Sequence, residues 1–331
     1  MDNQDNTKNS SFLLIEDLHM HFQAQGKLFG RGAIVRAVDG VSMKLAQGKT
    51  IAVVGESGSG KTTLGRAVLR LLKPTSGRVV FDGTDIASAK DDHLMWYRRR
   101  AQGISQDPFS SLDPYMTIDQ LLEEPLLIHK LGDKAARRQR VQWSLEQVRL
   151  LPAEEIQAKY PHTLSGGQRQ RVGIARALML QPELIVADEP VSMIDASSRA
   201  EILYLLRELQ QLHQIAFIYI THDLATARHF SQRIAVMYLG RIVEEAPTGS
   251  IIDSPLHPYT KALMDALPEP DPSNRHRERA VVTGEPPSPA NIPPGCRFHL
   301  RCPLFMEGKC DVTDPPYKEV NPDHWVACHL Y

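Results

Sequence analysis

The sequence predicts an α/β fold: one large domain around a parallel sheet, followed by a small, irregular C-terminal extension. Three observations support this. An apolar segment at 51–54 reads as a buried strand and runs into a glycine-rich turn and a helix. Apolar segments at 184–187 and 217–220 have the same strand-like composition and end in polar residues. Prolines are dense at 286–294, which indicates a stiff linker with little regular structure.

Length and composition narrow the class of protein. With 331 residues, the chain is long enough for a large domain and an appendage. Its formal net charge of −1 gives no bias toward nucleic acid, so we expect no nucleic-acid partner. No apolar run is long enough to cross a bilayer, and residues 1–10 lack the apolar core of a signal peptide. We therefore expect a disordered tail at 1–10 and a protein kept in the cytosol.

The other elements follow from periodicity and turn signals. Residues 13–22 suggest an edge strand with an aromatic residue, Phe22, near its end. The first helix is expected to turn one face inward, carrying Leu64, Val68, Leu71 and Leu72. The segment at 217–220 reads as the last parallel strand. The remaining expectations are a loop at 25–32, strands at 35–45 and 79–81, a turn at 82–83, helices at 117–129, 134–150 and 197–212, and solvated helix faces at Arg98, Arg99, Arg100, Arg137 and Arg138.

The stretch after the strand at 51–54 reads G-x-x-x-x-G-K-T. Its glycines allow backbone conformations that other residues resist, so that successive N–H groups can face one anion. Lys61 adds a positive charge, and the Thr62 hydroxyl can ligate Mg²⁺. The alternative is a glycine-rich turn without a ligand, but the flanking strand and helix favour a nucleoside triphosphate site. The residues expected to bind nucleotide are Gly55, Ser57, Gly58, Ser59, Gly60, Lys61, Thr62 and Thr63.

A second candidate anion site reads Leu-Ser-Gly-Gly-Gln, at 164–168, and opens a helix running to Leu180. A Ser-Gly-Gly turn at a helix N-terminus offers free N–H groups and a dipole end, although the same sequence also occurs as an ordinary helix cap. The strand that follows ends at Asp188 and Glu189. Asp188 can hold Mg²⁺, and Glu189 can orient and deprotonate an attacking water. His222, after the strand at 217–220, is placed to contact a γ-phosphate, with a capping role as the alternative.

In this order and spacing, the phosphate loop, Gln106, the Leu-Ser-Gly-Gly-Gln segment, Asp188-Glu189 and His222 resemble the nucleotide-binding domain of an ATP-binding cassette (ABC) ATPase. The resemblance covers about 12–250. It implies a RecA-like P-loop NTPase core, an antiparallel β subdomain and a helical subdomain at about 107–178. One departure is Met193-Ile194, where the family commonly has Ala-Leu before the aspartate.

The resemblance also implies roles for individual residues. Phe22 would lie against adenine, and Gln106 would sense Mg²⁺ and the membrane subunit. Two cassettes would pair head to tail around ATP. The residues that would act on the ATP of the other subunit are Ser165, Gly166, Gly167, Gln168 and Asp195. The residues implied in catalysis are Glu189, His222 and Gln106, with Thr62, Gln106 and Asp188 around Mg²⁺.

The C-terminal part, notably 254–263, 267–272 and Gly295–Pro303, resembles the extension of dipeptide/oligopeptide importer ATPases. The chain's four cysteines all lie here, with the spacing C-x₅-C-x₇-C-x₁₇-C. Four thiolates can hold a [4Fe–4S] cluster or a tetrahedral zinc ion, and the spacing does not decide between them. The resemblance implies the iron–sulfur cluster, with zinc and metal-free thiols as alternatives. The proposed ligands are Cys296, Cys302, Cys310 and Cys328.

The resemblance implies an ATPase that uses ATP and Mg²⁺ to power peptide import from the cytoplasmic face of the membrane, where it is peripheral. Its partners would be two transmembrane permease subunits, a second ABC ATPase and, indirectly, an extracytoplasmic substrate-binding protein. A paralogue is favoured as the second ATPase, with a second copy of this chain as the alternative. Other possible cargoes are nickel, heme and oligosaccharides. Other possible classes are a soluble ABC ATPase and a redox-regulated switch protein.

The expected domains are the nucleotide-binding domain at 11–253 and the extension at 254–331. The cysteines are distant in sequence from every phosphate-contacting motif. We therefore expect a purely structural cysteine site, on which ATP binding does not depend.

Overall fold

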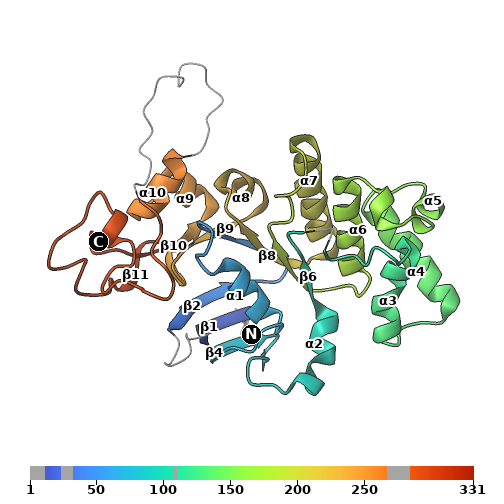
Figure 1. Cartoon of the computed structure of the whole chain (residues 1–331), viewed down its shortest axis with the longest axis horizontal. Helices are drawn as coiled ribbons and strands as arrows, with labels where there is room; N and C mark the ends of the chain where they lie inside the picture. Colours follow the sequence, from blue (N-terminus) through green and yellow to red (C-terminus); the bar gives the residue numbers. More distant parts are fainter. Residues whose placement is uncertain (1–11, 24–32, 108–109, 267–283) are drawn as a thin grey trace, which may run out of the picture.

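The computed structural model describes residues 12–23, 33–107, 110–266 and 284–331. The expected tail at 1–10, the expected loop at 25–32 and the segment 267–272 lie outside the described residues. Figure 1 shows two sheets, with a group of helices at one end of the molecule and the C-terminal segment at the other. The domain boundary expected at 253/254 stays a prediction.

The smaller sheet is antiparallel, with strand order β2-β1-β4-β5. Its strands are β1 (Leu13–Gln23), β2 (Ile34–Leu45), β4 (Ser76–Phe81) and β5 (Thr84–Asp85). The prediction of an edge strand at 13–22 is wrong, because β1 pairs with β2 on one side and with β4 on the other. The alternation of apolar and polar residues in β1 shows that one face of the strand is buried. It does not distinguish an interior strand from an edge strand.

The larger sheet has the order β11-β12-β10-β9-β3-β8-β7-β6. The strands from β9 to β6 in this order are parallel, whereas β10, β12 and β11 pair antiparallel. The segment at 217–220 is therefore not the last parallel strand, since β9 follows it in the chain. The bounds are β3 (Thr50–Val54), β6 (Ala101–Ile104), β7 (Leu184–Asp188), β8 (Ala216–Thr221), β9 (Arg233–Tyr238), β10 (Arg241–Pro247), β11 (Tyr317–Asn321) and β12 (His324–Ala327).

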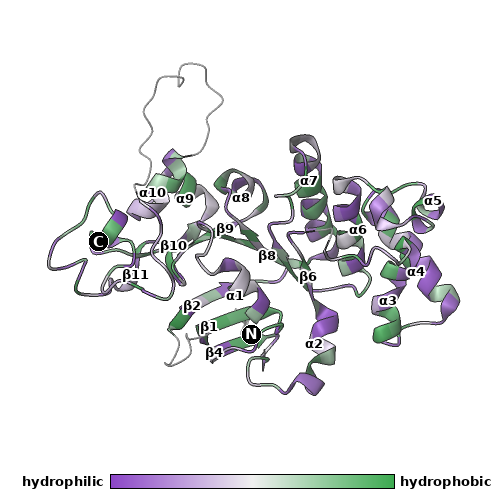
Figure 2. Cartoon of the chain, viewed as in Figure 1, coloured by the Kyte–Doolittle hydropathy of each residue, from purple (hydrophilic) through white to green (hydrophobic). Residues whose placement is uncertain are grey.

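Strand β3 is buried on both faces. Ile51 and Val53 join the core beneath the antiparallel sheet, and Ala52 and Val54 join the core beneath the helices. This explains the continuous apolar run, since a parallel strand covered on both sides needs no polar alternation. Figure 2 shows hydrophobic residues along the strands of both sheets and hydrophilic stretches on helices such as α2 (Met95–Arg100) and α4 (Lys134–Gln147).

Helices α3 to α6 (from Ile118 to Leu178) form the end of the molecule opposite the C-terminal segment, whereas α9 and α10 (from Thr248 to Asp265) lie beside that segment (Figure 1). Helix α1 ends at Val68, so Leu71 lies beyond the helix and is 68% exposed instead of buried as predicted. The helices are α1 (Lys61–Val68), α2 (Met95–Arg100), α3 (Ile118–Ile128), α4 (Lys134–Gln147), α5 (Ala153–Gln157), α6 (Gly166–Leu178), α7 (Ala196–His213), α8 (Leu224–Phe230), α9 (Thr248–Asp253) and α10 (Pro258–Asp265). In the described residues, no helix is long and apolar enough to cross a membrane.

Two of the arginines expected on solvated helix faces have partners. Arg100 donates to Glu183 at 2.6 Å and to Asp82 at 2.8 Å. Arg137 donates to Glu123 at 2.7 Å. Neighbouring arginines on a helix therefore do not by themselves indicate a solvated face, because they can equally form ion pairs within the fold.

The C-terminal extension is irregular over most of residues 284–316, as expected, but it ends in two strands that the sequence did not predict. Strand β12 pairs with β10 and with β11, so the extension adds two strands to the larger sheet. Glu244 of β10 is fully buried and joins both parts. Its carboxylate accepts from His324 Nε2 at 2.7 Å, and from the backbone N–H groups of Leu256 at 2.7 Å and His257 at 2.9 Å. Strands β11 and β12 were not predicted from the sequence, because they are short and prolines lie close to them.

An aromatic cluster fixes the extension to the core. The Phe298 ring lies 5.3 Å from those of Tyr238 and Tyr259, measured between centroids, and all three side chains are buried. We expect Phe298→Ala to lower the free energy of unfolding by about 3 kcal/mol, because it leaves a cavity in a packed core. Urea denaturation measures this, with Phe305→Ala as the control, since Phe305 is 42% exposed. Equal losses in both variants would contradict this role for Phe298.

Candidate nucleotide-binding site

The site forms where parallel strands end side by side. Strands β3, β8, β7 and β6 are neighbours in this order, so their carboxyl ends meet at one edge of the sheet. Beyond these ends follow the phosphate loop, His222, the pair Asp188-Glu189, and Gln106. Segments far apart in the chain thereby converge on one place.

The phosphate loop depends on glycines at two positions. Gly58 and Gly60 have φ angles of 78° and 102°, in the left-handed region that favours glycine. A Cβ on Gly60 would also lie 2.0 Å from the carbonyl oxygen of Ala37. Gly60 directly precedes α1, so the loop ends at a helix N-terminus without acidic residues in its first turn. This arrangement suits an anion.

Lys61 folds back into the loop. Its Nζ donates to the carbonyl oxygens of Gly55 at 2.7 Å and Glu56 at 2.8 Å, and to Ser59 Oγ at 3.3 Å. Burial lowers the pKa of Lys61, while the carboxylates of Glu189 and Asp188 act in the opposite direction. An arriving phosphate would supply this ammonium with an anionic partner.

A magnesium site fits at the next strand end. Thr62 Oγ1 donates to Asp188 Oδ1 at 3.1 Å. Burial raises the pKa of Asp188, against the effect of the Thr62 hydrogen bond. A hydroxyl and a carboxylate are hard oxygen ligands of the kind that Mg²⁺ prefers, and two protein ligands leave room for phosphate oxygens and water.

Glu189 lies between Gln106 and His222. Its Oε2 accepts from Gln106 Nε2 at 3.0 Å, and its Oε1 lies 3.0 Å from His222 Nδ1. Its backbone has a φ of 45°, a strained conformation for a residue with a side chain. The strand pairing supports this conformation, because the Glu189 N–H donates to the Ile220 carbonyl at 2.9 Å. The structure therefore brings together the three residues predicted for catalysis.

The predicted trans-acting residues lie elsewhere on the chain. Ser165 caps α6 through Gln168 N at 3.3 Å, and Gln168 Oε1 accepts from Ser165 N at 3.0 Å. Asp195 caps α7 through Ser198 N at 2.9 Å. The N-termini of α6 and α7 are neighbours, because a Cβ on Gly167 would lie 3.2 Å from Ser198 Oγ. Within the described part of the chain, these side-chain hydrogen bonds of Ser165 and Gln168 stay inside the cap, and Figure 1 shows α6 apart from α1.

Phe22, predicted at the adenine, lies near the end of β1 opposite Val35 and is 38% exposed. Its role stays a prediction.

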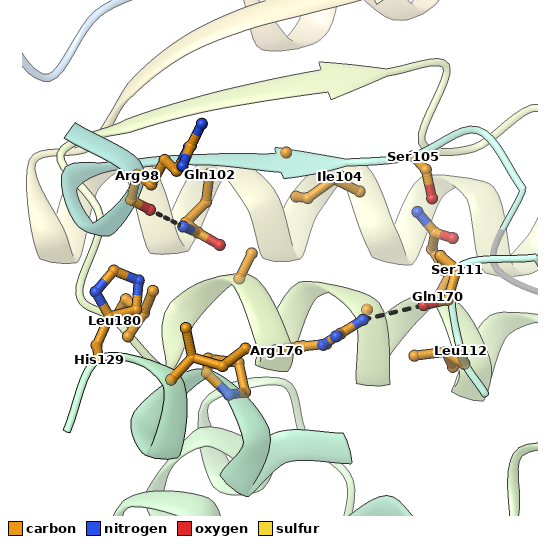
Figure 3. A pocket seen from close by; sticks show the side chains of 15 residues that line it. Arg98, Gln102, Ile104, Ser105, Ser111, Leu112, His129, Gln170, Arg176 and Leu180 are labelled. Carbon is orange, nitrogen blue, oxygen red and sulfur yellow. Dashed lines mark hydrogen bonds between the residues drawn. The ribbon is translucent and has the colours of Figure 1, made fainter. Parts of the chain in front are cut away.

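A groove of about 280 Å³ lies between β6 and the helices. Figure 3 shows Gln102, Ile104 and Ser105 of the β6 segment on one side and Gln170 and Arg176 of α6 on the other. Arg176 Nη1 donates to the Ser111 carbonyl at 3.0 Å across one end of the groove. Ser105 directly precedes Gln106, so the groove and the catalytic cluster share one loop.

The C-terminal extension contacts the phosphate loop, although its residues are distant from that loop in sequence. The expectation that ATP binding does not depend on the cysteine site stays a prediction. Arg301 Nη1 and Nη2 donate to the Glu56 carboxylate at 2.7 and 3.0 Å. The Glu56 N–H donates to the Tyr259 hydroxyl at 2.8 Å. Sequence distance was misleading because β10 and β12 lead the chain back across the sheet. Sequence reasoning missed these roles, although Tyr259 and Arg301 lie inside the stretches that carry the resemblance.

A second anchor lies beside the first. Arg297, which is buried, donates to the carboxylate of Asp39 and to the carbonyl of Leu239. Burial by itself raises the pKa of Asp39, but hydrogen bonds from Arg297, His21 and His19 hold it well below its ordinary value. Asp39 thus stays ionised and ties the extension to β2.

The four cysteines are free thiols that line one cavity, together with Phe298, Leu304 and Met306. Burial, together with the nearby thiols of Cys328, Cys310 and Cys302, raises the pKa of Cys296 to about 11. In the described part of the chain, the group of three potential ligand atoms within 4.8 Å of one another is His19, His21 and Asp39, so no three of the sulfurs lie that close. One tetrahedral zinc ion would hold its sulfurs about 3.8 Å apart, given Zn–S bonds of about 2.3 Å. A [4Fe–4S] cluster, with one iron inside each thiolate, would hold its four sulfurs further apart than a zinc ion does. Four thiols around one cavity are a donor set that suits such a group.

Comparison with known proteins follows the same division of the chain. Residues 38–192 match the family model for ABC transporters, and residues 243–310 match the C-terminal region of oligopeptide/dipeptide transporters. An ATP-binding protein of Brucella ovis, named for peptide import, is 48% identical over 316 residues, covering 96% of both chains. The oligopeptide transport ATP-binding protein AppF of Bacillus subtilis is 45% identical over 324 residues, covering 97% of this chain and 98% of AppF.

Solved structures of single cassettes have the same core fold. The cassette MJ0796, in a dimeric post-hydrolysis state bound to ADP and Pi, has a TM-score of 0.63 and 30% identity, covering 71% of this chain and 98% of that cassette. The cassette cbiO1 of Clostridium perfringens has a TM-score of 0.63 and 27% identity, covering 74% of this chain and 91% of its own. The chain therefore belongs to the ABC transporter family of ATP-binding proteins and carries the C-terminal region of its oligopeptide/dipeptide branch.

Proposed function

We propose that this chain is the ATP-hydrolysing subunit of an ABC importer of peptides. The observation that carries the proposal is Glu189, held between Gln106 and His222 beside the Thr62–Asp188 pair. The relatives named for peptide import, similar over nearly the whole chain, support the cargo class. Nickel, heme and oligosaccharides are less favoured, because the relatives and the matching C-terminal region are named for peptide or oligopeptide transport.

Each residue near the strand ends has a distinct task in hydrolysis. Mg²⁺, held by Thr62 and Asp188, would neutralise the charge that develops on the phosphates. Lys61 would leave its carbonyl partners for the phosphate oxygens. Glu189 would take a proton from the attacking water at one carboxylate oxygen, since its other oxygen is oriented by the Gln106 amide. His222, 60% exposed at its side chain, would turn toward the γ-phosphate.

Two cassettes complete the site. Ser165 and its neighbours lie apart from the phosphate loop in this chain, which supports their action on the ATP of a second subunit. The solved MJ0796 cassette is a dimer bound to ADP and Pi, which is consistent with such an arrangement. We favour a paralogue as this second subunit, with a second copy of this chain as the alternative.

The permease partners would dock in the groove beside α6. Its walls come from β6 and from the helices α3 and α6, so a segment inserted there would contact the loop that carries Gln106. Such a contact would couple movement of the permease to the catalytic cluster. The chain would then be peripheral at the cytoplasmic face of the membrane, and an extracytoplasmic binding protein would deliver the peptide.

The extension would hold a [4Fe–4S] cluster on Cys296, Cys302, Cys310 and Cys328. Four free thiols around one cavity, spread wider than one zinc ion requires, support this assignment over zinc. When bound, the cluster would supply four metal–ligand bonds that fix the loops between the cysteines.

Glu189→Gln is expected to keep ATP affinity and to lower hydrolysis by about 100-fold or more, because the amide retains the shape but removes the base. A phosphate-release assay and nucleotide titration measure both quantities. Glu183→Gln is the control, since Glu183 precedes the same strand at its opposite end. Wild-type turnover by Glu189→Gln would remove Glu189 from the mechanism.

Lys61→Ala and Ser165→Arg separate binding from assembly. Lys61→Ala is expected to weaken ATP binding by the isolated chain by about tenfold or more, because the charge that meets the phosphates is gone. Ser165→Arg is expected to leave that binding intact and to block ATP-driven closure with the second subunit. Crosslinking of mixed subunits reports closure. Equal loss of binding by the isolated chain in both variants speaks against the head-to-tail arrangement.

Anaerobically purified protein is expected to be brown and to contain iron and sulfide, because the four thiolates would retain the cluster in the absence of oxygen. Metal and sulfide analysis on the full chain measures the content. Cys302→Ser is the matched variant and is expected to lose most of the iron. Stoichiometric zinc without iron would reject the cluster.

A further inference from the structure

The contacts between the extension and the phosphate loop converge on one residue, Glu56. Glu56 is the second residue of the loop, directly after Gly55. The Arg301 side chain, 6% exposed, binds both oxygens of the Glu56 carboxylate in a two-pronged pair. Charge-assisted bidentate pairs of this kind fix direction as well as distance.

Tyr259 fixes the backbone of the same residue. Its hydroxyl accepts the Glu56 N–H at 2.8 Å, so this N–H is turned toward the extension. The Glu56 carbonyl accepts from Lys61 Nζ at 2.8 Å and from Ser59 N at 3.2 Å. The side chain, the N–H and the carbonyl of Glu56 are therefore all engaged, and two of these three contacts come from the extension.

The cysteine region in turn positions Arg301. A short 3₁₀ turn, His299–Arg301, directly precedes Cys302. The Arg301 N–H donates to the carbonyl of buried Phe298 at 3.0 Å, and the Cys296 N–H donates to the Cys310 carbonyl at 2.8 Å. Three of the four cysteines thus lie in the loop that carries Arg301 or are hydrogen-bonded to it.

We propose that Arg301 and Tyr259 are positioning residues for ATP binding: by holding Glu56 they set the phosphate loop, and the conformation of the cysteine region reaches the ATP site through them. A cavity of about 540 Å³ lies beside this contact, lined by Glu56–Ser59, Pro286–Pro289 and Arg301 among others. With the contact broken, this space lets the loop shift, and its N–H groups lose their common direction toward the phosphate. The proposal rests on the assignment of the phosphate loop as the ATP site.

Equilibrium titration of the isolated full chain with a fluorescent ATP analogue tests the proposal. Arg301→Gln and Tyr259→Phe are each expected to raise the Kd for ATP about three- to tenfold. Arg301→Lys, which keeps the charge but loses the two-pronged geometry, is expected to fall between wild type and Arg301→Gln. The Glu56→Gln/Arg301→Gln double variant is expected to lose no more affinity for ATP than whichever single variant binds ATP more weakly. The reason is that both changes break the same Glu56–Arg301 contact. In steady-state hydrolysis, KM rises and kcat changes less than about twofold.

Two controls separate positioning from loss of stability. Arg233→Gln breaks a comparable ion pair, to Glu245, and Tyr331→Phe removes a hydroxyl that donates to the Leu256 carbonyl, both away from the phosphate loop. Both are expected to bind ATP as wild type does. Wild-type affinity in Arg301→Gln and Tyr259→Phe overturns the proposal, as does equal weakening in the controls. If Lys61→Ala also binds as wild type, the assignment of the ATP site fails instead.

A separate variant tests whether the cysteine region affects ATP binding. Cys302→Ser is expected to raise the Kd for ATP in the same range, and not to add to the effect of Arg301→Gln. Thermal denaturation identifies variants that have lost the fold. Wild-type affinity in folded Cys302→Ser overturns the link between the cysteine region and the ATP site.

Discussion

Parallel pairing of β3 with β8, and of β8 with β7, is the constraint on which the rest of the structure depends. The register places Val54 beside Thr221, and Ile220 beside Asp188. These pairs set the relative positions of the phosphate loop, Asp188, Glu189 and His222, because each of them lies within a few residues of a strand end. Burial of β3 on both faces favours this register, since a slip by one residue would exchange Ile51 and Val53 with Ala52 and Val54 between two differently packed cores. The ATPase site is thus precise without a dedicated framework of its own.

Where local chemistry and element order carry the information, sequence reasoning picked out groups that the structure brings together. The phosphate loop, the carboxylates at 188–189 and His222 were predicted as site residues because each follows an apolar strand, and adjacent parallel strands share their ends. It failed where pairing between distant segments decides the outcome. The central place of β1 depends on β4, and the parallel strand β9 was overlooked. The strands β11 and β12 are too short to be predicted among prolines.

The C-terminal extension shows why distance along the chain is a poor guide to independence. Its attachments include Glu244, the aromatic cluster around Phe298, the Asp39–Arg297 pair and the Glu56–Arg301 pair. The Asp39–Arg297 pair is a buried ion pair. Removal of one partner of such a pair is strongly destabilising, because the other charge stays buried without compensation. We therefore expect substitutions in the cassette or in the extension to affect the stability of the other part.

The pairing of β12 with β10 has a consequence for handling the protein. Ile242, Val243 and Ala246 leave β10 apolar on both faces, and without β12 this strand would end the sheet with unpaired N–H and C=O groups. Such an edge is a template for aggregation between chains. In the intact chain the outermost strand is β11, which is short and carries exposed Lys318 and Glu319. The extension thus covers the apolar edge at β10 and leaves a charged strand, β11, at the edge of the sheet. A chain cut back to the cassette would lose this protection against self-association.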